Sequence, residues 1–222
     1  MSLLGTRRVT DLDGMIPPSG GYTFTGHLDS GAPPTPGPAT LTLGDLPLVG
    51  RILPGRGGED SPDRPAFVFA GGAGWRSLLP APGGLYKGPP AVRLSTVLRD
   101  LAGLAGEAYE APAEAKLGDA YGWDAGTPAD AVLADLVARG ALPAWRVDPL
   151  TGRTVFTPWP AIGAADARGT VVGRRLARGV REVALTTAVA AWLPGATVQG
   201  VRIARVVFKE TGEELRVEAW DA

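Results

Sequence analysis

The sequence predicts an α+β fold in which two β-rich parts flank a small α/β insertion. Alternating strand patterns fill residues 1 to about 70, helical periodicity occurs only in the middle of the chain, and strand patterns return after about residue 168. We therefore expect an N-terminal β domain over 1–74, an α/β domain over 75–162 and a C-terminal β domain over 163–222. A chain of 222 residues can bury a sizeable core.

The first part consists of short extended runs separated by loops. In "GYTFTGHLDS", Tyr22, Phe24 and Gly26 alternate with polar residues, which predicts a half-buried strand. The runs "ATLTLGDLPLVGRI" and "AFVFA" predict further strands. The proline-rich "SGAPPTPGPA" predicts a connection, because proline lacks the N–H that a central strand needs. "PGRGGEDSPDRP" predicts a second long loop.

The first of two expected helices runs to about Ala105. Ser95 is its expected N-cap, and Gly106 is the expected stop. Its apolar face carries four residues at helical spacing, namely Val97, Leu98, Leu101 and Leu104.

The second expected helix lies in "TPADAVLADLVARGAL". Thr127 is the expected N-cap, Pro128 occupies the first helical position, Asp130 faces the positive helix end, and Gly140 ends the helix. Its buried stripe consists of Val132, Leu133, Leu136 and Val137.

The remaining segments predict hairpins. "AWRV" and "RTVFTPW" flank the turn "DPLTG" at the end of the middle part. In the last part, "GVREVALTT" and "VRIARVVFKETGEELRVEAW" predict strands, with "ETGE" as a turn. "WLPGATVQG" predicts the loop that leads into the last hairpin.

Composition excludes several classes of function. The net charge of −1 argues against sequence-specific nucleic-acid binding, since such proteins usually carry a strong basic excess. The absence of cysteine removes disulfides, thiolate metal sites and cysteine nucleophiles. No run approaches the roughly 18 apolar residues of a membrane span, and the start "MSLLGTRRVTDLDG" is unlike a secretory signal. We expect a soluble protein without a membrane anchor, made in the cytoplasm.

The glycine-rich stretch "AGGAGWRS" is similar to a nucleotide-binding loop but lacks the features that would complete one. The third glycine of a dinucleotide fingerprint is missing, and the following "LLPAPGGLYKGPP" cannot start the helix that a pyrophosphate needs. No Gly-Lys-Ser/Thr occurs in the chain. We expect these glycines to serve a sharp turn or close backbone approach, with Trp75 as a packing anchor.

Three further groups of residues could carry chemistry, and each has a simpler explanation. His27, the sole histidine, lies in a strand pattern; a triad or metal site built on it stays open, but no G-x-S-x-G elbow supports it. Glu107, Glu110 and Glu114 could form a glycosidase pair, yet their Pro-containing segment predicts a solvated loop. We expect no catalytic, cofactor-binding or metal-binding residues and no cofactor. Six tryptophans are expected mainly as core anchors, with an interface role as the competitor: Trp75, Trp123, Trp145, Trp159, Trp192 and Trp220.

Several segments together resemble the hub proteins at the tip of phage tails, whose modules also occur in contractile injection systems. They are "LTLGDLPLVGRI", "VFAGGAGWRSLLPAPGGLYKGPPAVRLSTVLRDLAGLAGE", "ADAVLADLVARGALPAWRVDPLTGRTVFTPWP" and the closing "WLPGATVQGVRIARVVFKETGEELRVEAW". The resemblance covers most of residues 40 to 222 as a pattern and not as an invariant motif. It implies two β-barrel-like parts, similar to the tail-tube protein, around the α/β insertion.

The resemblance also implies a function. A hub of this family is a structural virion protein, not an enzyme, that continues the tail tube, adapts its symmetry to a spike and leaves a channel for DNA. The implied partners are further copies of the chain, most simply as a homotrimer, with a tail-tube or distal tail protein, a spike or tip protein and the tape-measure protein. The implied location is the tail tip or baseplate of a virion assembled in a bacterium.

Two other functions stay open from the sequence. One is a tail-associated module that binds carbohydrate or recognises the host, which glycan-array binding would favour. The other is a small cell-wall hydrolase, which turnover of peptidoglycan would favour.

Overall fold

The computed structural model describes residues 1–54, 64–88, 91–161, 169–175, 180–185, 189–198, 201–212 and 214–221. The chain forms two compact units. Unit 1 comprises Met1–Gly71, Pro149–Thr151 and Trp159–Ala222, and unit 2 comprises Gly72–Asp148 and Gly152–Pro158. Unit 1 therefore contains both ends of the chain, and unit 2 contains both α-helices.

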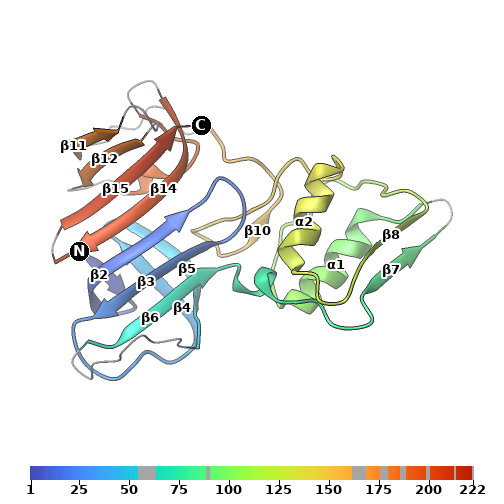
Figure 1. The fold of residues 1–222 in the computed structure, drawn as a ribbon, viewed down its shortest axis with the longest axis horizontal. Helices are drawn as coiled ribbons and strands as arrows, with labels where there is room; N and C mark the ends of the chain where they lie inside the picture. The colour runs from blue at the N-terminus through green and yellow to red at the C-terminus, as the bar shows by residue number, and fades with distance from the viewer. Residues whose placement is uncertain are drawn as a thin grey trace. The chain divides into compact units, whose positions relative to one another are not determined.

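The N-terminal strands of unit 1 close into a six-stranded antiparallel barrel (Figure 1). Neighbouring strands follow the order β1-β4-β5-β6-β3-β2, and β1 also pairs with β2, which closes the ring. The barrel removes the free edges that an open sheet would expose. Its strands are β1 (Ser2–Leu4), β2 (Arg7–Ile16), β3 (Tyr22–Leu28), β4 (Gly37–Leu43), β5 (Leu46–Ile52) and β6 (Ala66–Gly71).

Alternation along the barrel strands separates a buried face from an outer face. In β3, Tyr22, Phe24 and Leu28 are almost completely buried, as the alternating pattern predicted. The ring of Phe24 lies 6.1 Å from that of Phe208, which belongs to a strand near the other end of the chain. The barrel core therefore continues into the C-terminal part of unit 1.

The C-terminal strands extend the sheet of the barrel. β14 (Val201–Thr211) pairs with β2, and β15 (Glu214–Asp221), β12 (Val180–Leu185) and β11 (Gly169–Arg175) follow in that order. The predicted strands of the last part are confirmed. Among the described residues these four strands form an open extension and do not close into a second barrel.

Unit 2 is a small α/β unit in which two helices pack with a two-stranded ribbon (Figure 1). The helices are α1 (Leu94–Ala105) and α2 (Ala129–Ala138), and the ribbon pairs β7 (Gly84–Lys87) with β8 (Ala120–Trp123). A 3-10 helix, η1 (Ala73–Arg76), precedes them. The predicted hairpin is confirmed as β9 (Arg146–Val147) and β10 (Thr154–Val155).

Both predicted N-caps are wrong. α1 begins at Leu94, so Ser95 lies inside the first turn, where its N–H and its hydroxyl both donate to the carboxylate of Glu114. α2 begins at Ala129, and the side chain of Thr127 makes no cap. Main-chain carbonyls from other segments accept the first helical N–H groups instead, which short-range sequence signals cannot reveal.

The other helix signals hold except at three positions: Pro128 precedes the first helical residue of α2, and Leu104 and Val137 are not fully buried. Gly106 and Gly140 end their helices with φ values of 66° and 73°, as predicted. Leu104 is half exposed and does not belong to the buried face of α1. In α2 the predicted stripe is buried at Val132, Leu133 and Leu136, while Val137 is only partly buried.

The predicted connections need smaller corrections. β4 begins at Gly37, so the end of "SGAPPTPGPA" is a strand in which Pro38 pairs with Arg51. Proline is tolerated there because β1 pairs with β4 only at Leu41–Leu43, which leaves one side of Pro38 without a strand partner. The loop "WLPGATVQG" contains the short strand β13 (Thr197–Val198) and follows η3 (Val189–Trp192). The predicted loop before β6 lies mostly at 55–63, outside the described residues.

Candidate functional site

The glycine-rich loop after β6 is a turn packed against the end of α1. Gly72 has φ 70°, in the left-handed region that favours glycine. A Cβ on Gly74 would lie 1.9 Å from the carbonyl oxygen of Ala105. The N–H of Gly74 donates to Oε1 of Glu107 at 2.6 Å. A carboxylate of the protein itself thus occupies a donor that a phosphate would need.

Trp75 anchors this loop in the core of unit 2. Its side chain is almost fully buried, and its Nε1–H donates to Oγ1 of Thr154 at 2.6 Å. Its ring meets that of Trp145 edge to face at 6.4 Å between centroids. The packing role predicted for Trp75 is therefore confirmed.

The three glutamates do not form a carboxylate pair across a cleft, and two of them are not the free loop residues that the sequence predicted. Glu107 binds the main chain of Gly74. Glu114 accepts hydrogen bonds from Ser95 at the start of α1, and these bonds hold the pKa of its carboxyl below the usual value. Both contacts are long-range, so composition of the segment could not reveal them. Glu110 is exposed as expected, and its N–H donates to the carbonyl of Thr154.

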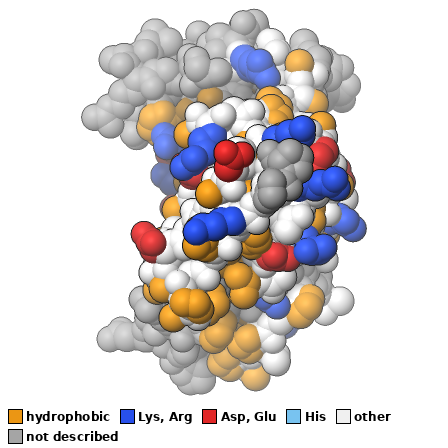
Figure 2. Space-filling model, turned by 90° about the vertical axis from the view of Figure 1, so that its right-hand side faces the viewer, with side chains coloured by type: hydrophobic (Ala, Val, Ile, Leu, Met, Phe, Trp, Pro, Cys, Tyr) orange, Lys and Arg blue, Asp and Glu red, His pale blue; other side chains and the backbone are white. Residues whose placement is uncertain are grey.

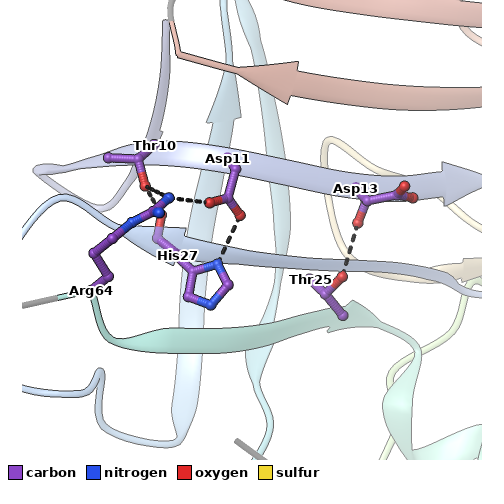
Figure 3. A network of polar contacts seen from close by, with 6 residues as sticks. All are labelled: Thr10, Asp11, Asp13, Thr25, His27 and Arg64. Atoms are coloured by element: carbon purple, nitrogen blue, oxygen red, sulfur yellow. Dashed lines mark hydrogen bonds and ion pairs between the residues drawn. The ribbon is translucent and has the colours of Figure 1, made fainter. Parts of the chain in front are cut away.

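His27 belongs to a polar network on the outer face of the barrel (Figure 3). Its Nδ1 lies 2.8 Å from Oδ1 of Asp11 on the neighbouring strand, and the other carboxylate oxygen accepts a hydrogen bond from Arg64 at 2.5 Å. Thr10 donates to the carbonyl of His27 at 3.3 Å. The side chain of His27 is 41% exposed. His27 is therefore a surface strand residue, as predicted.

The same outer face continues across β6, β3, β2, β14 and β15. Asp11 lies opposite His27 on one side and Thr211 on the other. Further along, Lys209 pairs with Glu218 at 2.7 Å. The face is polar, and oppositely charged groups on it lie in contact with one another.

Four of the six tryptophans, Trp75, Trp145, Trp159 and Trp192, are buried and cannot stack on a sugar. The guanidinium of Arg205 covers the ring of Trp220 at 4.0 Å, and Trp123 contacts Tyr86. The predominance of core anchors is confirmed.

The helices of unit 2 carry exposed ion pairs, Arg99 with Asp100 and Arg139 with Asp135. On the face of the chain drawn in Figure 2, basic and acidic side chains are interspersed, and hydrophobic side chains gather in the lower half. In the part of the chain that the structure describes, no group of three or more acidic or histidine side chains could hold a metal ion. None of the described helices has the length and apolar character needed to cross a membrane.

Two tyrosine–aspartate pairs escaped the sequence analysis. The hydroxyl of Tyr86 on β7 donates to Asp100 of α1 at 3.2 Å, and that of Tyr121 on β8 donates to Asp135 of α2 at 3.0 Å. Burial first, and then the neighbouring carboxylate, raises the pKa of Tyr86 to about 12, and the same two causes raise the pKa of Tyr121. The repeated "VLRDL" and "VLADL" around the aspartates was the signal that could have found them.

No protein-family model matches the sequence, and no curated protein does. Solved structures do match in fold. The 43 kDa tail protein of prophage MuSo2 from Shewanella oneidensis has a TM-score of 0.60 at 12% identity, over 98% of this chain and 96% of its own. The E. coli c3393 protein has a TM-score of 0.63 at 12% identity, over 100% of this chain and 75% of its own. It is a component of the type VI secretion system with structural similarity to the T4 tail proteins gp27 and gp5. This chain therefore shares its fold with a phage tail protein and with a component of a type VI secretion system. The fold agrees with the resemblance to tail hubs, except that the second barrel-like part is not closed within the described residues.

Proposed function

We propose that this protein is a structural component of a phage tail, the hub at the tail tip or baseplate. It caps or continues the tail tube, connects it to the spike or tip protein and leaves a channel for DNA. The observation that carries the proposal is the fold match to the MuSo2 tail protein, which spans nearly all of both chains. In this role the chain is made in the bacterial cytoplasm and ends in the virion.

The strand order of unit 1 supports assembly into a ring. Within the described residues β11 pairs only with β12, so one side of β11 ends the sheet. A free edge of this kind is a template for pairing with another chain, and proteins cover it by assembly. In our proposal three copies form the ring, which adapts a sixfold tube to a threefold spike. The distal tail or tube protein and the tape-measure protein bind to it.

In the same proposal, residues 1–74, 75–162 and 163–222 act as three modules. The first is the barrel described above, and the last supplies a second tail-tube-like part built on β14, β15, β12 and β11. The middle module, with α1 and α2, is available for contacts with other tail proteins.

The charge of the protein suits a channel that lets DNA pass. The chain has a net charge of −1, and the outer sheet face of unit 1 carries ion pairs such as Lys209 with Glu218. A surface without excess positive charge gains little counterion release from DNA. The wall of the channel would therefore not hold DNA tightly.

The mass of the purified chain and of the protein in the virion tests the ring. We expect a trimer, at least at high concentration or in the particle. A strict monomer in both settings would contradict the trimer.

Two proline variants of the edge strand sharpen this test. Adjacent residues of a strand direct their N–H groups to opposite sides, so only one of Thr170→Pro and Val171→Pro removes an N–H that faces β12. The other variant should fold normally and lose the trimer. If both variants remain folded trimers, β11 is not the contact.

The enzymatic alternative is tested on host cell wall. The proposal predicts no clearing zone on zymograms that include a lysozyme as positive control. A zone that disappears in Glu107→Gln or Glu110→Gln would establish a hydrolase. The carbohydrate-binding alternative is tested on a glycan array, where we expect no specific signal.

A further inference from the structure

The β7–β8 ribbon of unit 2 has a symmetric register. Tyr86 lies directly opposite Tyr121, and on either side of this pair Leu85 faces Gly122 and Lys87 faces Ala120. A two-fold axis through the tyrosine pair exchanges these two flanking pairs. The positions two residues from the tyrosine pair obey the same axis. At one end Gly84 faces Trp123, and at the other end the N–H of Gly88 donates to the carbonyl of Asp119.

The helices obey the same relation as the strands. Each aspartate that binds a tyrosine lies 14 residues after it in the chain. The spacing that separates Tyr86 from Tyr121 also separates the first residues of the helices, Leu94 and Ala129, and superimposes "VLRDL" on "VLADL". The buried residues of the helices correspond in the same way: Leu94, Val97, Leu98 and Leu101 in α1, and Ala129, Val132, Leu133 and Leu136 in α2.

The segments before the strands make similar contacts that are shifted by three residues, since Ala115 lies six residues before Tyr121 and Ser77 nine residues before Tyr86. The N–H of Leu94 donates to the carbonyl of Ala115, and the N–H of Ala129 donates to that of Ser77. Each of these contacts lies next to an isolated antiparallel bridge between the same two segments. In each case the segment before one strand holds the start of the helix that follows the other strand.

The two bridges are similar but show the same shift, since Lys116 lies five residues before Tyr121 and Leu78 eight residues before Tyr86. Arg93 bridges Lys116 just before α1, and Pro128 bridges Leu78 just before α2. Each bridge therefore joins one half of the unit to the other half, and neither joins a half to itself.

We propose that unit 2 is an internal pseudo-dimer, in which residues 77–106 (copy 1) and 115–140 (copy 2) are two versions of one strand–helix segment intertwined about a local two-fold axis. The axis passes between Tyr86 and Tyr121. Ribbon pairing and both bridges run between the copies, as in a swapped dimer joined into one chain. The inference is independent of the proposed role in a phage tail.

The copies agree where they pack and differ where they meet solvent. The residues shared by "VLRDL" and "VLADL" are buried or bind a tyrosine. At the solvent face, Leu104 of copy 1 is 50% exposed. Its counterpart Arg139 binds Asp135 at 2.7 Å and lies over the ring of Tyr121. The two helices therefore share one packing solution and present different surfaces.

Engineered disulfides test the two-fold axis in the full chain, which has no cysteine of its own. The pairs Arg93→Cys with Lys116→Cys and Leu78→Cys with Pro128→Cys replace exposed residues at the two corresponding bridges. Opposed residues of antiparallel strands lie within the span of a disulfide. We expect both pairs to oxidise to a comparable yield. The control Arg93→Cys with Leu78→Cys joins two residues of copy 1 that belong to different bridges, and it should stay reduced. Closure of only one bridge would overturn the symmetry.

An exchange of segments tests whether the copies are equivalent in sequence. Residues 84–105 of the full chain are replaced by the sequence of 119–140, which keeps a tyrosine at 86 and an aspartate at 100. We expect cooperative melting and a phenol pKa at position 86 that stays well above 10. The matched control inserts the sequence of 118–139 and shifts every contact by one residue, so it should lose both properties.

The first exchange replaces Leu94 by alanine, and the resulting cavity would by itself destabilise the protein. The reciprocal exchange, which places the sequence of 84–105 at 119–140, leaves Leu94 in place and is therefore the second test. If both exchanges are as unfolded as the shifted control, the two segments are not equivalent and the proposal is wrong.

Discussion

Unit 1 and unit 2 are built by opposite strategies. In unit 1 the barrel strand β2 pairs with β14 from the other end of the chain, and the N–H of Ser2 donates to the buried carboxylate of Glu210 across a separation of 208 residues. In unit 2, Tyr86 and Tyr121 each bind an aspartate only 14 residues away, so the arrangement occurs twice. Unit 1 is held together by contacts between residues far apart in the sequence, whereas in unit 2 one short strand–helix arrangement occurs twice. We expect unit 2 to be the faster of the two to order, because non-local pairing requires more loop closure.

The largest effects should come from the aromatic core of each unit. Phe208→Ala in unit 1 and Trp75→Ala in unit 2 each remove a ring that is almost fully buried. We expect each to lower the free energy of unfolding by about 3–5 kcal/mol, measured by denaturant titration. Leu85→Ala is the control, since Leu85 is 71% exposed and should change little. A loss below about 1 kcal/mol at either ring would mean that the core of that unit can repack.

The next effect concerns the close approach inside unit 2. Gly74→Ala places a methyl group against the carbonyl of Ala105 and should destabilise by about 1–3 kcal/mol, the usual cost of overpacking. Gly103→Ala is the matched control, because nothing lies within 4 Å of its Cβ position in α1. It should stabilise the protein by about 0.5–1 kcal/mol through helix propensity. Thermal melts of both variants distinguish the steric effect from a general intolerance of alanine.

The tyrosine pairs should give a smaller and pH-dependent effect. Tyr86→Phe removes one hydrogen bond to a carboxylate and should cost about 0.5–1.5 kcal/mol at neutral pH. The pKa of Tyr86 is about 12 in the folded protein, against 10.0 ordinarily. Between these values the unfolded chain loses the proton that the folded chain keeps, so the free energy of unfolding falls as pH rises.

Tyr121→Phe supplies the comparison, because the pKa of Tyr121 is also raised. In urea titrations across this pH range, the free energy of unfolding of each single variant should fall less steeply with pH than that of the wild type. In the double variant it should fall less steeply still. A decline identical to that of the wild type in the double variant would mean that other groups cause it.

The smallest effect is expected on the outer face of unit 1. His27→Ala removes a contact with Asp11 in which the side chain of His27 is 41% exposed and that of Asp11 is 34% exposed. Exposed ion pairs contribute about 0–1 kcal/mol, so the melting temperature should hardly change. A large loss of stability would show that this network holds β2 and β3 in register.

Much of the architecture could be read from local patterns. Alternation identified β3 and the final hairpin, and helical spacing together with Gly106 and Gly140 identified both helices and their ends. The missing third glycine and the prolines after Trp75 argued for a packing role of the loop, and the structure assigns Trp75 to the core. These features depend on neighbours within a few residues, so the order of residues alone carries them.

Tertiary structure decided the features that join distant segments. Closure of the barrel by β1, the capping of α1 by Glu114 and the occupation of the Gly74 N–H by Glu107 each involve residues from separate parts of the chain. No periodicity encodes such a partner, because a hydrogen-bonding group accepts whichever complementary group the packed core brings to it. For the same reason Ser95 and Thr127, sound capping residues by type, do not cap, because carbonyls and a carboxylate from other segments accept the N–H groups at the helix starts.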